Sequence, residues 1–85
     1  MNKVDKQVGE IFRQRRRELN WTQEYLGKKL GVAYSTVACW ERGIRGMGLD
    51  NFFKCCDILG LEPDQVYSLV RKNKEYSFTN ENKKT

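Results

Sequence analysis

The chain has 85 residues, which is enough for one small domain with a modest core. No apolar run approaches the roughly 20 residues that cross a bilayer, and residues 1–7 are polar, so we expect a cytoplasmic protein without a membrane partner. Three cysteines without a CxxC pair, and the absence of histidine, argue against a zinc site and a disulfide framework, and we expect no metal site. We interpret Cys55 and Cys56 as small core-side residues of a helix.

The net charge is +5, and it is unevenly distributed along the chain. Residues 1–45 carry ten Lys and Arg against five Asp and Glu, and residues 71–85 carry five against two. Residues 46–70 carry one against four. This asymmetry favours a polyanionic partner, although many small basic proteins bind no nucleic acid.

Apolar residues at helical spacing predict a first helix over residues 5–19, with one stripe formed by Val8, Ile11, Phe12 and Leu19. Asn20 follows it, a residue type that tolerates a left-handed helix end. Thr22 then has the hydroxyl of an N-cap for a second helix over residues 23–30, which Gly31 ends.

A third helix is predicted over residues 34–42, ending at Gly43, and Ala33 before it lacks a capping hydroxyl. Residues 43–48 contain three glycines and are typical of a loop. A fourth helix over residues 49–59 follows, with an inner side that we expect to consist of Phe52, Phe53, Cys56 and Leu59.

Pro63 opens the fifth helix at a first-turn position where its missing N–H costs nothing. The apolar face of that helix is predicted to be Val66, Leu69 and Val70. Residues 1–72 therefore form the predicted domain, and residues 73–85 are predicted to be a flexible tail. A short strand around Tyr76 and Phe78, paired with a partner, is the less favoured alternative for the tail.

Residues 22–43 have the spacing of a helix-turn-helix, with two short helices joined by a tight turn at Gly31. The small Gly27 in the first of them lets the second cross closely. The crossing requires five buried positions: Leu26, Leu30, Val32, Val37 and Trp40. We interpret Trp21, like Trp40, as a core residue and not as a stacking platform for single-stranded nucleic acid.

Taken together, these motifs resemble the phage-repressor/Cro helix-turn-helix family. The resemblance covers about residues 8–70 and rests on Val8-Gly9-Glu10, Arg16, Thr22-Gln23-Glu24, Leu26, Leu30-Gly31-Val32, Trp40-Glu41-Arg42-Gly43 and the helix before Gly60. It implies an all-α, compact five-helix, lambda-repressor-like DNA-binding domain. The chain departs from the family pattern at Arg15, Asn20, Ala33 and Met47.

The third helix has a side that we expect to read DNA bases. Successive residues turn a helix by about 100°, so placing Val37 and Trp40 inward puts Ser35, Ala38, Cys39 and Arg42 outward. The N-terminal part of such a helix meets base edges in the major groove of double-stranded DNA. The predicted base-reading residues, which agree with the base-reading positions of the family, are Tyr34, Ser35, Thr36 and Cys39. A merely solvated face would normally carry Lys or Glu.

Phosphate contacts are predicted at both ends of this unit. Thr22 and Gln23 lie at the start of the second helix, where free N–H groups favour an anion. Arg42 and Arg45 follow the third helix. The resemblance also implies an ion pair between Arg16 and Glu41, so we expect Arg16 to be structural first and a phosphate contact second.

These features predict a transcription regulator, most simply a phage-type or mobile-element repressor. One unit touches few base pairs, so we expect a homodimer on a near-palindromic operator, with recognition helices about 34 Å apart. Family members often pair through the C-terminal region, which makes Leu61, Val66, Leu69 and Val70 the predicted dimer surface.

The sequence is compatible with a second class of function and argues against a third. A protein-interaction module of the same fold, such as an antitoxin or an antirepressor, remains the alternative. An enzyme is not expected, because the chain has no histidine, no nucleophile–base pair and no phosphate-cradling glycine loop. We likewise expect no cofactor and no small-molecule substrate.

Overall fold

The computed structural model describes residues 3–72, and within them it contains five α-helices and no strand. They are α1 (Lys3–Glu18), α2 (Gln23–Leu30), α3 (Tyr34–Arg42), α4 (Gly48–Leu59) and α5 (Pro63–Lys72). The all-α prediction is confirmed, and the predicted tail, 73–85, lies outside the described residues. None of these helices is long and apolar enough to cross a membrane.

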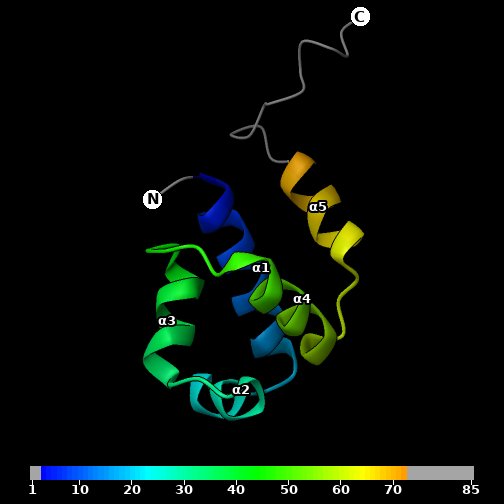
Figure 1. Ribbon diagram of the computed structural model, residues 1–85. Coiled ribbons are helices and arrows are strands. Elements are labelled where there is room, and N and C mark those ends of the chain that lie inside the picture. Colours follow the sequence, from blue (N-terminus) through cyan, green and yellow to red (C-terminus); the bar gives the residue numbers. More distant parts are fainter. Residues whose placement is uncertain (1–2, 73–85) are drawn as a thin grey trace, which may run out of the picture.

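The helices enclose one core. In Figure 1, α1 runs through the middle of the molecule, with α3 on one side, α4 and α5 on the other, and α2 across the lower end. All five helices contribute to a single cluster of buried side chains, which consists of Phe12, Leu26, Leu30, Val37, Trp40, Cys55, Cys56, Leu59 and Val66.

The helix ends follow the predicted signals. Asn20 has a positive φ of 62°, alone among the described non-glycine residues. The Thr22 hydroxyl accepts a hydrogen bond from the Tyr25 N–H at 2.9 Å and so caps α2. Gly31 ends α2 in the left-handed conformation, with φ 78°, which suits a residue without Cβ. At Ala33 no side chain caps α3.

The first helix lies directly against the C-terminal part of α3. A Cβ atom at Gly9 would overlap the Trp40 carbonyl oxygen and would lie 2.7 Å from that of Glu41. At Gly43, a Cβ atom would lie 2.6 Å from the Lys6 Cα atom. The two backbones are therefore in contact, and α1 fixes where α3 ends.

The predicted inner side of α4 was wrong at one position. Phe53 is 49% exposed, whereas Cys55 is 1% exposed and takes the place in the core. Residues 52, 55, 56 and 59 follow the helical spacing of three and four, so Phe53 falls outside the buried stripe. Phe52 is half-buried and packs on Phe12, with ring centroids 5.8 Å apart.

Trp21 is half-buried and packs against the core, in line with its predicted place there. Its ring meets the Tyr25 ring edge-on at a centroid distance of 5.0 Å. The Lys29 ammonium lies 5.6 Å from the Trp21 centroid and 5.3 Å from that of Tyr25. The exposed Lys29 thus contacts an aromatic pair at the surface.

Candidate nucleic-acid interface

The second and third helices form the predicted helix-turn-helix. The turn between them packs on α2 at Gly27, where a Cβ atom would lie 2.7 Å from the Val32 carbonyl oxygen. Leu26, Leu30 and Val37 are buried beneath the crossing, while Val32 is half-buried. Any side chain at position 27 would push the turn away, so the glycine sets how closely the two helices approach.

One side of α3 is open to solvent. Val37 and Trp40 point into the core, as predicted. Tyr34 is 61% exposed and Ser35 is also exposed. The other side chains of this surface are half-buried, and they are Thr36, Ala38 and Cys39. The predicted base-reading residues therefore lie together on the surface of one helix.

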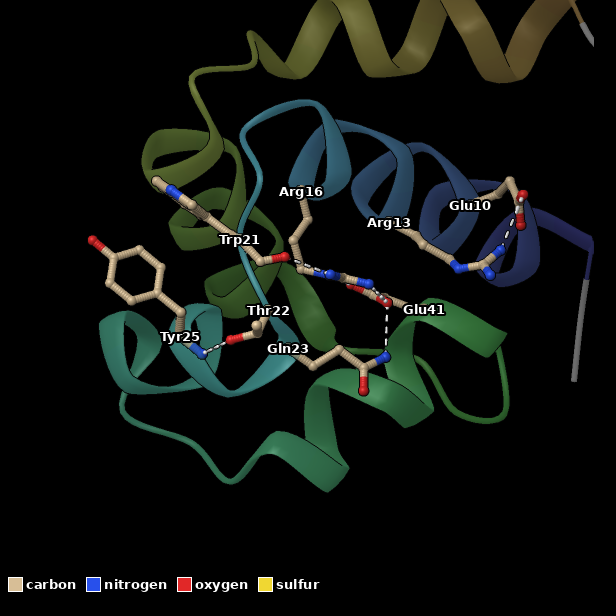
Figure 2. A network of polar contacts seen from close by, with 8 residues as sticks. All are labelled: Glu10, Arg13, Arg16, Trp21, Thr22, Gln23, Tyr25 and Glu41. Atoms are coloured by element: carbon tan, nitrogen blue, oxygen red, sulfur yellow. Dashed lines mark hydrogen bonds and ion pairs between the residues drawn. The ribbon is translucent and has the colours of Figure 1, made fainter.

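A buried ion pair joins α1 to the end of α3 (Figure 2). Arg16 donates from Nε to Glu41 Oε2 at 2.7 Å and from Nη2 to Glu41 Oε1 at 3.1 Å. Its Nη1 donates to the Trp21 carbonyl oxygen at 2.7 Å. The two side chains are 8% and 4% exposed. The ion pair expected from the resemblance is thus present in the structure.

This burial supports the structural role predicted first for Arg16. All three guanidinium nitrogens donate to Glu41 or Trp21, and the side chain is largely shielded from solvent. The phosphate contact predicted second for Arg16 stays a prediction.

Glu41 of this ion pair also binds Gln23, which was predicted as a phosphate contact. Gln23 donates from Nε2 to Glu41 Oε1 at 3.0 Å, which fixes its side-chain amide at the start of α2. An amide nitrogen carries two hydrogens, so one N–H is left for an outside acceptor. No sequence pattern indicates this link, because it depends on how α2 and α3 lie relative to each other.

The remaining predicted phosphate contacts are exposed. Thr22 keeps its hydroxyl hydrogen available, because the oxygen acts as the acceptor in the cap. Arg42 lies in the last turn of α3, and Arg45 lies in the loop before α4; both are exposed.

A polar hollow of about 430 Å³ opens between α1, the start of α2 and the end of α3. It brings Gln23 and Arg42, two predicted phosphate contacts, together with α1 residues for which no site role was predicted. Its lining is Lys6, Glu10, Arg13, Gln23, Glu41 and Arg42. The spacing of residues 6, 10 and 13 was a usable signal, because it places them on one side of α1. Mixed charge at such spacing is also usual on a solvated helix, so the spacing alone does not indicate a site.

The predicted dimer surface needs correction. Val66 and Val70 are 1% and 4% exposed, so their side chains pack inside this chain and not against a partner. Leu61 is half-buried and packs on the core. Of the four residues, only Leu69 is exposed.

The two adjacent cysteines are buried thiols. Burial, with the neighbouring Cys56 and Glu41 adding to it, raises the pKa of Cys55 to about 12. Burial also raises the pKa of Cys56 to about 11. Both thiols are therefore protonated near neutral pH, and neither is a reactive nucleophile. Among residues 3–72, no three His, Cys, Asp or Glu side chains are grouped to hold a metal ion.

Comparison with known proteins agrees with this geometry. The helix-turn-helix family model matches residues 12–66. Two proteins of Sinorhizobium fredii, both named as uncharacterized HTH-type transcriptional regulators, are 33% and 35% identical over 66 residues. Each alignment covers 78% of this chain and 46% of the relative. An uncharacterized transcriptional regulator in the ATPase CF(0) region of Rhodospirillum rubrum is 31% identical over 65 residues, covering 76% of this chain and 60% of its own length.

The fold, with its exposed third helix, defines a helix-turn-helix domain of the DNA-binding class. The chain belongs to the helix-turn-helix family, which confirms the family predicted from the sequence motifs. The alignments span just under half the length of the two Sinorhizobium relatives. No solved structure matches the chain with significance.

Proposed function

We propose that the chain binds double-stranded DNA sequence-specifically, through α3 in the major groove, and regulates transcription. The observation that carries this proposal is the open side of α3, where exposed Tyr34 and Ser35 precede exposed Arg42. A major groove admits one α-helix, and the N-terminal residues of that helix meet the base edges. The relatives named as transcriptional regulators support the same role.

The side chains of this surface favour particular base contacts. Tyr34, Ser35 and Thr36 offer hydroxyl groups, which donate to or accept from base edges. Cys39, one turn further along α3, offers a small apolar group that fits against a thymine methyl. Bidentate readout of guanine needs Arg or Lys, which these four positions do not provide.

Phosphate contacts would set the register of α3 in the groove. Thr22 and Gln23 offer an O–H and an N–H at the start of α2, where the helix end favours an anion. Arg42 and Arg45 add positive charge at the other end of the unit. None of these four contacts depends on base identity, so they position the protein and do not specify the sequence.

The protein would act as a homodimer on a near-palindromic operator. One α3 touches only a few base pairs, and a two-fold pair doubles the readout at about one turn of DNA. Exposed Tyr67 and Leu69 on α5 support a contact through this helix. A dimer bound across a promoter would exclude polymerase, so repression is the simplest regulatory outcome.

Selection of binding sites from a random duplex pool tests the proposal. We expect enrichment of an inverted repeat whose half-sites are centred about one helical turn apart. Weak binding at moderate salt, with no enriched sequence, would overturn the proposal. That result would favour the protein-interaction alternative, an antitoxin or antirepressor of the same fold.

A further inference from the structure

The polar hollow beside α3 combines groups from three helices. Gln23 forms one wall at the start of α2, Arg42 forms another at the end of α3, and α1 supplies Lys6, Glu10 and Arg13. Gln23 and Arg42 were predicted as phosphate contacts from their separate places in the helix-turn-helix. The structure shows that both border the same space.

The charge of this hollow is predominantly positive. Its lining contains three cations, Lys6, Arg13 and Arg42, and two carboxylates, Glu10 and Glu41. Glu41 is already bound by the buried Arg16 guanidinium at 2.7 Å and by Gln23 at 3.0 Å. Its negative charge is thereby compensated within the protein, which leaves three cations facing one exposed carboxylate.

That carboxylate holds its neighbour only weakly. Arg13 Nη1 lies 3.7 Å from Glu10 Oε2, beyond hydrogen-bond distance, and both side chains remain substantially exposed. Exposed pairs of this kind contribute little to stability, so an incoming anion displaces the carboxylate at small cost. Glu10 is therefore a competitor for Arg13 and not a permanent partner.

The backbone below these side chains is rigidly placed. Lys6 lies against Gly43, and Gly9 lies against the Trp40 and Glu41 carbonyl oxygens. Residues on this side of α1 thus stay at a fixed separation from Arg42. Figure 2 shows Glu10 and Arg13 following one another along α1, on the side that carries Arg16 toward Glu41 and Gln23.

We propose that this hollow seats a phosphate of the DNA backbone, with Lys6 and Arg13 as contacts from α1 and Glu10 as a carboxylate that weakens them. The inference rests on the proposed DNA binding and adds a third segment, α1, to the contact surface. It assigns to Lys6 and Arg13 an electrostatic role that is independent of base sequence.

The test is the salt dependence of duplex binding, measured for Arg13→Gln and Lys6→Gln on the selected operator and on an unrelated duplex. The slope of log K against log salt is negative, and each lost phosphate contact decreases its magnitude by about 0.9. We expect that decrease on both duplexes, because a phosphate contact does not distinguish sequences. The matched control is Arg17→Gln, an exposed α1 residue outside the hollow, which should leave the slope within experimental error.

Replacing the competing carboxylate should have the opposite effect. Glu10→Gln frees Arg13, so we expect severalfold tighter duplex binding at low salt and a steeper slope. The control is Glu18→Gln, which removes the same charge from α1 at a carboxylate that pairs with Arg15. Equal effects of the two Glu variants, or of Arg13→Gln and Arg17→Gln, would mean a general charge effect. Either result would overturn the proposal that the hollow binds a phosphate.

Two measurements keep the inference separate from the proposed function. Thermal unfolding of every variant shows whether it is folded, and these exposed positions should change the melting temperature little. If the unaltered chain binds no duplex, the proposed function fails. If it binds the operator and Arg13→Gln and Lys6→Gln bind with an unchanged salt slope, only the α1 contact fails.

Discussion

Arg16 has a structural role that a substitution can measure. Its guanidinium joins α1 to Glu41 and to the Trp21 carbonyl oxygen, so Arg16→Ala leaves a buried carboxylate without its main partner. Removing one partner of a buried pair costs about 3–5 kcal/mol. We expect a loss of that size in the free energy of unfolding, measured by urea denaturation.

Arg17→Ala is the matched control for this variant, because Arg17 is the next residue of α1 and is exposed. Its free energy of unfolding should change by less than about 0.5 kcal/mol. Similar losses in the two variants would show that the Arg16–Glu41 pair adds nothing beyond an ordinary surface charge.

Ser35 is the residue at which base reading can be tested with the smallest change. Ser35→Ala removes one hydroxyl from an exposed position of α3 and leaves a good helix former in its place. We expect a lost base contact to cost about 1–3 kcal/mol of discrimination between the operator and a single-base variant. Fluorescence anisotropy on both duplexes measures it.

Gln14→Ala, an exposed change on α1, serves as the control for Ser35→Ala. Its discrimination should equal that of the unaltered chain. A Ser35→Ala variant that discriminates equally well at every operator position would remove Ser35 from the base-reading residues.

The buried thiols predict how stability depends on alkaline pH. The pKa of Cys55 is raised from 9.0 to about 12, so the folded chain holds this proton more tightly than the unfolded chain. Above about pH 9 the unfolded state binds fewer protons, and stability falls as the pH rises toward the folded-state pKa. The contribution is fully present below pH 9.

Urea unfolding at a series of pH values between 7 and 11 measures this slope. Cys55→Ala lacks the ionising group, so its stability should be lower at pH 7 and should fall less steeply above pH 9. Identical alkaline slopes in the two chains would contradict the buried, protonated thiol.

The role of a residue could be predicted where the family pattern specifies both members of an interacting pair. Arg16 and Glu41 followed from the resemblance, and their contact is present. The link from Gln23 to Glu41 did not follow, because it depends on a side-chain rotamer and on the distance between two helices. The burial of Arg16 did not follow from the sequence either, since burial of a charged side chain is a property of the packed molecule.

At the scale of elements, the contact between α1 and α3 decides where the reading helix lies. In the interior of an exposed helix, Gly→Ala is stabilising by about 1 kcal/mol. At Gly9 we expect the opposite sign, because the added Cβ would overlap the Trp40 carbonyl oxygen. Overpacking of this kind typically costs about 1–3 kcal/mol.

Thermal unfolding of Gly9→Ala tests the sign. The control is Gln14→Ala, which introduces the same residue into an exposed position of the same helix. A Gly9→Ala chain that melts at or above the temperature of the unaltered chain would show that α1 and α3 are not in backbone contact.

Helix ends were well predicted where they carry a local chemical signal. Thr22 caps α2, and Gly31 and Gly43 end α2 and α3 in the left-handed conformation. The buried face of α4 was less predictable. Phe53 is the larger apolar side chain, but helical spacing places the small Cys55 on the buried stripe, so geometry outweighed hydrophobicity.

At the scale of the whole molecule, the sequence does not distinguish a core face from a partner face on the last helix. Val66 and Val70 have the pattern of a dimer surface, yet a domain of this size needs them for its own core. Leu69 and Tyr67 remain outward on α5. The packing of α5 in the folded chain is what distinguishes the core residues Val66 and Val70 from the exposed Tyr67 and Leu69.

Two-fold pairing makes a prediction about DNA spacing. If two copies bind as one rigid pair, their α3 helices face the same side of the duplex only when the half-sites are about 10 base pairs apart or a multiple of that. Inserting about 5 base pairs turns one half-site to the opposite face, whereas about 10 restores the face at a larger separation.

Binding isotherms on operators with these insertions distinguish a dimer from independent monomers. For a dimer, we expect affinity to fall to that of a single half-site with the insertion of about 5 base pairs, because the second α3 then points away from its groove. Independent monomers would bind every spacing equally, each half-site with its own affinity. Equal binding across the series would therefore contradict the proposed homodimer. It would not contradict the proposed base-reading surface of α3, since that surface belongs to one chain.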